Sequence, residues 1–363
     1  MGAYSTLILL ILLTINIIIL IWSIWEVIPN IGDSRFSLFL VTPWIVDIVE
    51  LGGTSLAVYH VLLVVAICLS FIWMINRSLW TFVLELRIRP LGGKHSPLYL
   101  IGTIFFSLIA FNFFYYLTLG AGGIFPETPG FEEQDLWKLL FAFANASVWE
   151  ELITRVLFIG IPLLIYHLIR RKSRRLRSYI IGGGFDMGGA EVVLLVFSSG
   201  MFAAAHLNSW DAFKMLPTFI AGLALGYLFL RVGLYASIML HFAFDYLSVP
   251  IDVSQSMVVT MLIGLVMLAW IVVGSCYFYY YATRVMGFLL GKELWPPRIL
   301  RERGRPTFYI PSVPMPSRDG SVGGPRAGMA PPGGFGFSCK YCGHTEARYK
   351  DGEFHCLRCG GKN

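Results

Sequence analysis

Apolar residues dominate the first 284 positions and gather into long runs with few charges. A helix that crosses a bilayer needs about 20 mostly apolar residues. Eight runs of roughly that length span residues 5–28, 55–76, 97–120, 137–169, 191–210, 215–231, 234–250 and 256–283. The pattern therefore predicts an all-α polytopic membrane protein with about eight transmembrane helices.

A ninth segment is ambiguous. Residues 36–51, FSLFLVTPWIVDIVEL, mix apolar residues with Asp47 and Glu50. We interpret it as a helix lying in the membrane interface, with an additional span as the alternative.

Composition supports this assignment. Of 363 residues, 56% are hydrophobic and only 14% are charged, and the mean hydropathy is +0.68. Soluble domains carry about 25% charged residues. The net charge of +6 arises entirely after position 284, where 12 basic and 6 acidic residues occur.

Basic residues predict the orientation, because they concentrate in cytoplasmic loops. They occur in the loop at 77–96, in RRKSRRLR at 170–177, and at Arg231 and Arg284. With eight spans, all of these lie on one side. We therefore expect an integral multi-pass protein of the cell membrane with both termini in the cytoplasm.

The chain changes character after the transmembrane core (1–284). Residues 285–337 are first basic and then rich in Pro and Gly, which is typical of a flexible linker. Residues 338–363 predict a small zinc-ribbon β module with a hairpin turn at Asp351-Gly352. Two C-x-x-C pairs would hold a structural zinc ion through Cys339, Cys342, Cys356 and Cys359. The partner of this module is unknown, and nucleic acid is not expected because no basic patch interleaved with aromatics is present.

Charged residues inside the fourth run call for an explanation. SVWEELITRVLF (147–158) contains Glu150, Glu151 and Arg155, and ionisable residues at a helix centre are costly in a membrane. Glu151 and Arg155 are four residues apart on a helix and can pair. Glu150 points about 100° away, so it needs a partner from another helix or a water-filled cavity.

Two later runs offer such partners. MFAAAHLN carries His206 four residues after Phe202, and MLHFAFDYL carries His241 and Asp245 one turn apart. The simplest arrangement points Glu150, His206, His241 and Asp245 at a common cavity. Between them, Gly222 and Gly226 form a G-x-x-x-G step that lets helices approach closely.

In this order, E-E-x-x-x-R, F-x-x-x-H and H-x-x-x-D on separate helices resemble the CPBP family of intramembrane proteases. That family includes CAAX prenyl endopeptidases of the Ras-converting type and bacteriocin-processing relatives. The resemblance covers roughly residues 97–284, and the three motifs are specific only together. Asp245 stands where the CAAX-processing members commonly have Asn.

The resemblance implies roles for these residues. Glu150 would be the general base, with His206 sharing in activation of a water molecule. His241 would stabilise the oxyanion, and Asp245 would orient the His241 side chain. Glu151, Arg155 and Phe202 would hold these residues in place. A catalytic zinc ion held by the two histidines with Glu150 or Asp245 is the alternative mechanism, which we do not favour.

The function expected from the resemblance is hydrolysis of peptide bonds in or near the membrane, including CAAX-type processing. The partners would be a peptide or lipidated protein substrate and membrane lipids. A non-catalytic membrane scaffold and a proton-coupled transporter are the rival classes, since intramembrane Glu, His and Asp also line transport paths. Regular helices would place Glu150 near mid-membrane, so access to it requires irregular helices or an inverted orientation.

Overall fold

The computed structural model describes residues 2–32, 34–41, 45–87, 95–126, 134–171, 174–208 and 210–292, and the backbone of 347–350 and 353–356. The chain divides into two compact units. One comprises Met1–Arg89 with His95–Tyr281, and the other comprises Pro90–Lys94 with Ala282–Asn363. The first unit is the helical bundle that carries the candidate site.

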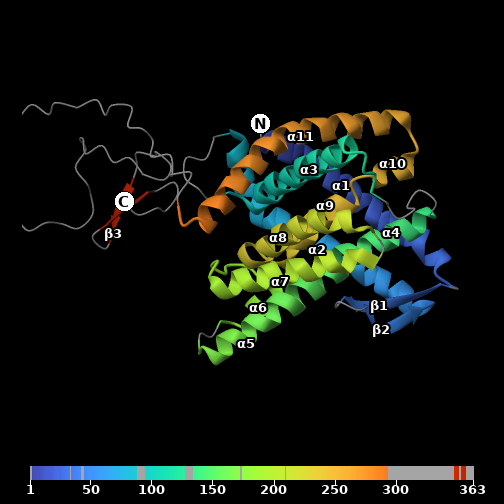
Figure 1. The fold of residues 1–363 in the computed structure, drawn as a ribbon, viewed down its shortest axis with the longest axis horizontal. Helices are drawn as coiled ribbons and strands as arrows, with labels where there is room; N and C mark the ends of the chain where they lie inside the picture. Colours follow the sequence, from blue (N-terminus) through green and yellow to red (C-terminus); the bar gives the residue numbers. More distant parts are fainter. Residues whose placement is uncertain are drawn as a thin grey trace, which may run out of the picture. The chain divides into compact units, whose positions relative to one another are not determined.

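Helices form nearly all of this unit (Figure 1). They are α1 (Gly2–Val27), α2 (Thr54–Arg87), α3 (Pro97–Ala121), α4 (Leu136–Asn145), α5 (Ile161–Ile169), α6 (Arg177–Ile181), α7 (Gly189–Ala205), α8 (Met215–Arg231), α9 (Leu234–Asp245), α10 (Val249–Ser254) and α11 (Met257–Leu289). Short 3₁₀ turns are η1 (Ile28–Asn30), η5 (His206–Asn208) and η6 (Ala212–Lys214). Two π-helical segments, η3 (Ala146–Glu150) and η4 (Leu152–Gly160), join α4 to α5 in one continuous helix.

Six of the eight predicted spans are confirmed as helices long and apolar enough to cross a membrane, within the part of the chain that the structure describes. The fifth and seventh runs give the shorter helices α7 and α9, of 17 and 12 residues. At 1.5 Å per residue these are about 26 and 18 Å long, less than a hydrocarbon core of about 30 Å. They end at Ala205 and Asp245, earlier than predicted, because polar or Pro-containing turns follow. Both helices therefore stop at the candidate site residues.

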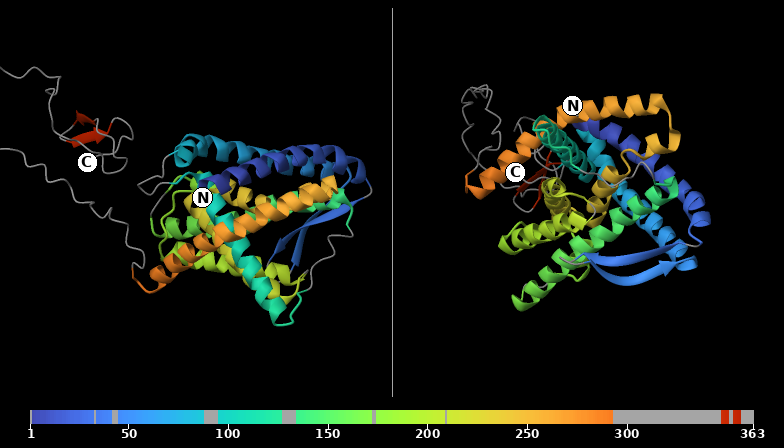
Figure 2. Two further views of the ribbon diagram at one scale, coloured as in Figure 1. Left: turned by 90° about the horizontal axis from the view of Figure 1, so that it is seen from above. Right: turned by 45° about the vertical axis from the view of Figure 1, so that its right-hand side comes forward.

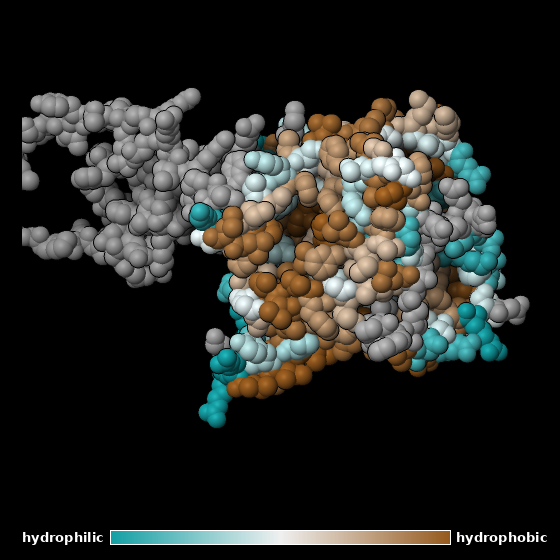
Figure 3. Space-filling model, in the orientation of Figure 1, coloured by the Kyte–Doolittle hydropathy of each residue, from teal (hydrophilic) through white to brown (hydrophobic). Residues whose placement is uncertain are grey.

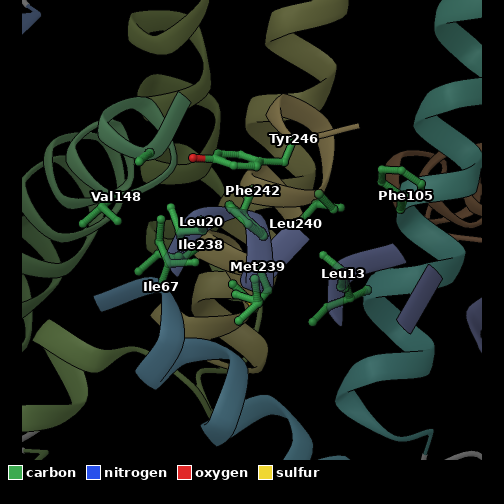
Figure 4. Packing of buried hydrophobic residues seen from close by; sticks show 14 of the residues in the cluster. Leu13, Leu20, Ile67, Phe105, Val148, Ile238, Met239, Leu240, Phe242 and Tyr246 are labelled. Carbon is green, nitrogen blue, oxygen red and sulfur yellow. The ribbon is translucent and has the colours of Figure 1, made fainter. Parts of the chain in front are cut away.

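Helix α9 lies at the centre of the bundle. Every residue from Ala236 to Ala243 is buried. Figure 4 shows its apolar side chains packed against Leu13 and Leu20 of α1, Ile67 of α2 and Phe105 of α3. Apolar residues on all sides of a helix are expected when it is surrounded by others. This position fixes His241 and Asp245 against several neighbouring helices.

Helices α7 and α8 pack closely at Gly222. A Cβ atom added there would lie 3.0 Å from Cα of Ser199 on α7. The predicted role of the G-x-x-x-G step in close helix approach is therefore observed at this glycine. The α7–α8 contact positions the end of α7, which leads directly into His206.

The glycine-rich loop after α6 closes the other end of α8. Gly182, Gly183 and Gly184 all have positive φ, which glycine adopts without strain. The backbone amides of Gly183, Gly184 and Phe185 donate to the carbonyls of Phe229, Arg231 and Leu230, respectively. The loop thereby satisfies carbonyls that the end of a helix leaves unpaired.

The prediction of an interfacial helix over residues 36–51 is wrong. The structure has an antiparallel hairpin instead, β1 (Arg35–Val41) and β2 (Ile45–Gly52), which lies outside the helices (Figure 2). The segment is rich in Val, Ile and Phe, which favour strands, and Pro43 in its middle disfavours a helix. These two signals were available in the sequence and outweigh its mixed polarity.

The surface of the bundle matches a membrane environment. Many large apolar side chains are exposed on α1, α2 and α11, including Trp80 and Val272. Figure 3 shows apolar residues over the middle of the bundle and hydrophilic residues gathered towards its two ends. A soluble monomer rarely exposes a contiguous apolar patch of more than a few hundred Å², so this many exposed apolar side chains indicate contact with lipid.

Little of the C-terminal region is described. Strands β3 (Ala347–Lys350) and β4 (Glu353–Cys356) pair antiparallel, with Lys350 opposite Glu353. They flank the predicted turn at Asp351-Gly352. The linker from residue 293 onwards and Cys339, Cys342 and Cys359 lie outside the described residues, so the zinc site stays a prediction.

Candidate active site

Glu150 and Glu151 lie where the long helix changes its winding. Glu150 ends the π-helical segment η3, and Glu151 separates it from η4. π-Helical segments are rare and frequently occur at functional sites. The Thr154 hydroxyl donates to the Glu150 carbonyl at 2.5 Å. The helix is thus irregular where the sequence predicted chemistry.

Glu151 is the centre of a buried polar network. Its carboxylate is fully buried and accepts from Arg155 Nε at 3.0 Å, the pair expected from their spacing. It also accepts from the Ser237 hydroxyl and lies 2.9 Å from His241 Nδ1. A buried charge is tolerated when it is paired and hydrogen-bonded in this way.

Arg155 is held on its other side by α7. Its Nη1 donates to the Ser198 hydroxyl at 3.1 Å, and that hydroxyl donates to the Thr154 carbonyl. The guanidinium carbon also lies 5.2 Å from the centroid of the Phe202 ring. Arg155 therefore ties the π-helical segment to the helix that ends beside His206.

His241 joins three carboxylates from two helices. Its Nδ1 faces Glu151, while its Nε2 lies 3.4 Å from Asp245 Oδ2 and 3.8 Å from Glu150 Oε2. The Ser147 hydroxyl lies 3.3 Å from Asp245 Oδ2. Glu151, rather than Asp245, thus holds the Nδ1 side of the ring. Glu150 and Asp245 share the Nε2 side.

His206 begins the 3₁₀ turn after α7. Its Nδ1 lies 2.8 Å from the Phe202 carbonyl, and a carbonyl only accepts, so Nδ1 carries the hydrogen. In the neutral ring, Nε2 is then an acceptor. The Phe202 ring contacts both imidazoles edge-on, with centroids 4.9 Å from His206 and 5.9 Å from His241. Among the described contacts, none is a hydrogen bond from His206 to Glu150.

The two glutamates differ in their accessibility. The Glu150 side chain is 28% exposed and that of Asp245 is 22% exposed, whereas Glu151 is fully enclosed. Glu150 Oε2 itself is buried and has no hydrogen-bond partner within the described part of the chain. A reactant can therefore approach Glu150 but cannot approach Glu151.

The structure brings together Glu150, Glu151, Arg155, His241 and Asp245 by direct contacts, and connects His206 through Phe202. Sequence reasoning did not identify Ser147, Ser198 and Ser237. Serines are common in membrane helices, so no local signal distinguished them. Their one shared feature is a position within one helical turn of a motif residue.

The partners of the histidine nitrogens bear on the metal-dependent alternative. His241 contacts carboxylates at both nitrogens, and His206 uses Nδ1 for a backbone carbonyl. Among the residues that the structure describes, no group of three or more His, Cys, Asp or Glu side chains is placed to hold one.

The fold and the site define a polytopic membrane protein with a carboxylate–imidazole centre between short and irregular helices. Residues 132–247 match the family model described as Rce1-like, type II CAAX prenyl endopeptidase Rce1-like. This range contains every motif residue from Glu150 to Asp245, and the resemblance inferred from the motifs is confirmed for it. No curated protein and no solved structure matches the chain.

The family supports a coarse assignment. The described helices are those of an integral membrane protein, and the segment that carries the site is similar to the type II CAAX prenyl endopeptidases. The finer features, which are the reaction mechanism and the role of each residue, are proposals.

Proposed function

We propose that this protein hydrolyses peptide bonds of prenylated or membrane-proximal C-termini with a water molecule activated by Glu150. The observation that carries the proposal is the position of the Glu150 carboxylate. The side chain is 28% exposed, and its buried Oε2 lies 3.8 Å from His241 Nε2 without a hydrogen bond in the described part of the chain. A carboxylate so placed can accept a proton from water and later deliver it to the leaving amine.

The other residues complete the reaction. His241 is oriented by Glu151 at Nδ1, and in its protonated form its Nε2–H would donate to the oxyanion that forms when water attacks the carbonyl carbon. His206 would accept from the attacking water at Nε2. Asp245 faces the same side as Glu150 and would help to hold the His241 ring. Arg155, Ser198 and Ser237 would keep Glu151 in place.

The test is cleavage of a fluorogenic farnesylated peptide by the purified full-length protein. Glu150→Gln keeps the size of the side chain and removes the base, so kcat should fall by about 10²–10⁴-fold. Glu191→Gln is the matched control, because Glu191 also lies near a histidine, 3.7 Å from His167 Nε2, but away from the site. Equal turnover by wild type and Glu150→Gln would eliminate the assigned base. Failure of wild type to cleave any peptide would favour a scaffold or a transporter.

Metal content separates the two mechanisms. We expect one zinc ion per chain, bound by the four C-terminal cysteines and lost in Cys356→Ser. Cys68→Ser should retain it. A second zinc ion per chain that disappears in a His206→Ala variant would contradict the glutamate mechanism and support the metal-dependent one.

A further inference from the structure

Strand β1 lies against the helices that carry the candidate site. The Phe36 ring packs on Phe141 of α4 with centroids 4.9 Å apart, and Leu38 is buried. On β2, by contrast, Val46 and Ile48 are about half exposed. Figure 2 shows the hairpin alongside the α4–α5 helix. β1 is thus the inner strand of the hairpin.

The edge of β1 away from β2 has no strand partner. The described sheet contains only two strands, in the order β1-β2. One carbonyl of β1, that of Phe39, accepts a hydrogen bond of 2.9 Å from Trp149 Nε1. Trp149 is the residue before Glu150. β1 therefore contacts the turn of the helix that carries the candidate base.

The pairing of β1 with β2 is irregular at the same position. Leu38 pairs with Val49 and Phe39 pairs with Asp47, so β2 carries one extra residue, Ile48. β-Bulges bend a strand and are over-represented next to active sites. This bulge lies directly opposite the residue that contacts Trp149.

A peptide substrate in a membrane protein needs partners for its backbone. A helical segment must unwind before its peptide bond can be attacked, and exposed backbone N–H and C=O groups are strongly disfavoured in an apolar environment. An open strand edge supplies hydrogen-bond partners for any sequence, since it pairs with main-chain atoms. Neighbouring strands lie about 4.8 Å apart, so a strand added at Phe39 would run beside the helical turn that contains Trp149 and Glu150.

We propose that β1 is the docking strand of the substrate, which adds to its free edge as an extended peptide and so presents the scissile bond to Glu150. This inference rests on the proposed protease function. The inference goes beyond that function because it assigns a substrate-binding element outside residues 132–247, the segment that matches the family. The occupant is an unfolded peptide segment that is recognised through its main chain. During docking, a backbone N–H of the substrate replaces the Trp149 N–H as the donor to the Phe39 carbonyl.

The first test uses the substrate rather than the protein, so that no variant can misfold. A series of peptides, each with one N-methylated amide, is assayed with the wild-type protein. Strand addition predicts that KM rises about 2- to 10-fold at every second position on one side of the scissile bond, because one hydrogen bond is lost at each. The intervening positions should change little. A profile without this alternation would overturn the proposal.

The second test locates the substrate. p-Benzoylphenylalanine replaces Phe39 in β1 or, as the matched control, Ile48 in β2, in a Glu150→Gln background that leaves the peptide intact. We expect cross-linking to the peptide from position 39, suppressed by unlabelled substrate, and none from position 48. Equal or absent cross-linking at both positions would contradict the docking strand. If wild type cleaves peptides while both tests fail, only this inference falls; if wild type cleaves none, the proposed function falls with it.

Discussion

Glu150 and Glu151 are adjacent in the chain, yet their surroundings are opposite. Glu151 is enclosed by Arg155, Ser237 and His241, while Glu150 keeps part of its side chain exposed. Burial of a charge with three partners is a structural arrangement, whereas a partly exposed side chain whose Oε2 makes no hydrogen bond among the described residues is suited to chemistry. The two residues should therefore respond differently to the same substitution.

Glu151→Gln should destabilise the protein as well as reduce its activity. Loss of the charge leaves Arg155 buried without its partner, which costs about 3–5 kcal/mol in the free energy of unfolding. Unfolding in detergent, followed by loss of helical signal with increasing denaturant, measures this change. Glu150→Gln is the control and should unfold like wild type. An unchanged midpoint for Glu151→Gln would show that the network contributes nothing to stability.

At this scale the sequence predicted much of the site. Helical spacing alone gave the Glu151–Arg155 pair and the separation of Glu150 from it. It did not give the contact between Glu151 and His241, because that depends on which helices are neighbours and on the π-helical winding around Glu151. Neither property follows from the local pattern of residues.

Among the elements, the short helices α7 and α9 determine where the site lies, because α7 ends directly before His206 and α9 ends at Asp245. The sequence predicted both as full spans, since apolar residues continue past their ends. Their early ends and the π-helical segments place the site near helix termini. Irregular helices are thus observed at Glu150, and the orientation of the bundle stays a prediction. The hairpin was missed because mixed polarity was given more weight than β-branched residues and Pro43.

The packing of α7 on α8 predicts the effect of a larger residue at position 222. Gly222→Val would place its Cβ 3.0 Å from Cα of Ser199 and force the two helices apart, which should cost about 1–3 kcal/mol. Activity should fall too, since Phe202 and His206 follow on α7. Gly264→Val is the control, because an added Cβ there meets no atom within 4 Å. Equal stability of the two variants in a detergent unfolding assay would contradict the close contact.

For the whole molecule, the distribution of charge predicts how the bundle sits in the membrane. Basic residues gather after α5 and around α6, including Arg170, Arg174 and Arg177, whereas the opposite ends of the spans carry few. Positively charged loops remain in the cytoplasm. The ends at which α7 and α9 stop would then face the other side of the membrane, so the site would open towards that face.

Cysteine labelling tests this orientation. Arg175→Cys and Phe125→Cys lie on opposite sides of the single span Leu136–Ile169. A membrane-impermeant maleimide added to intact cells should label position 125 and leave position 175 unlabelled until the membrane is opened, as read by mass spectrometry of the labelled peptides. Labelling of position 175 from outside would invert the orientation.

The central claim is that Glu150 activates the water that cleaves the peptide. The most direct measurement is single-turnover cleavage of the farnesylated peptide by chelator-treated wild type, Glu150→Asp and Glu150→Gln, each shown to unfold at the wild-type midpoint. The account predicts full activity for wild type, reduced but measurable cleavage with the shorter carboxylate, and a loss of about 10²–10⁴-fold for the amide. Cleavage by Glu150→Gln at the wild-type rate would contradict it.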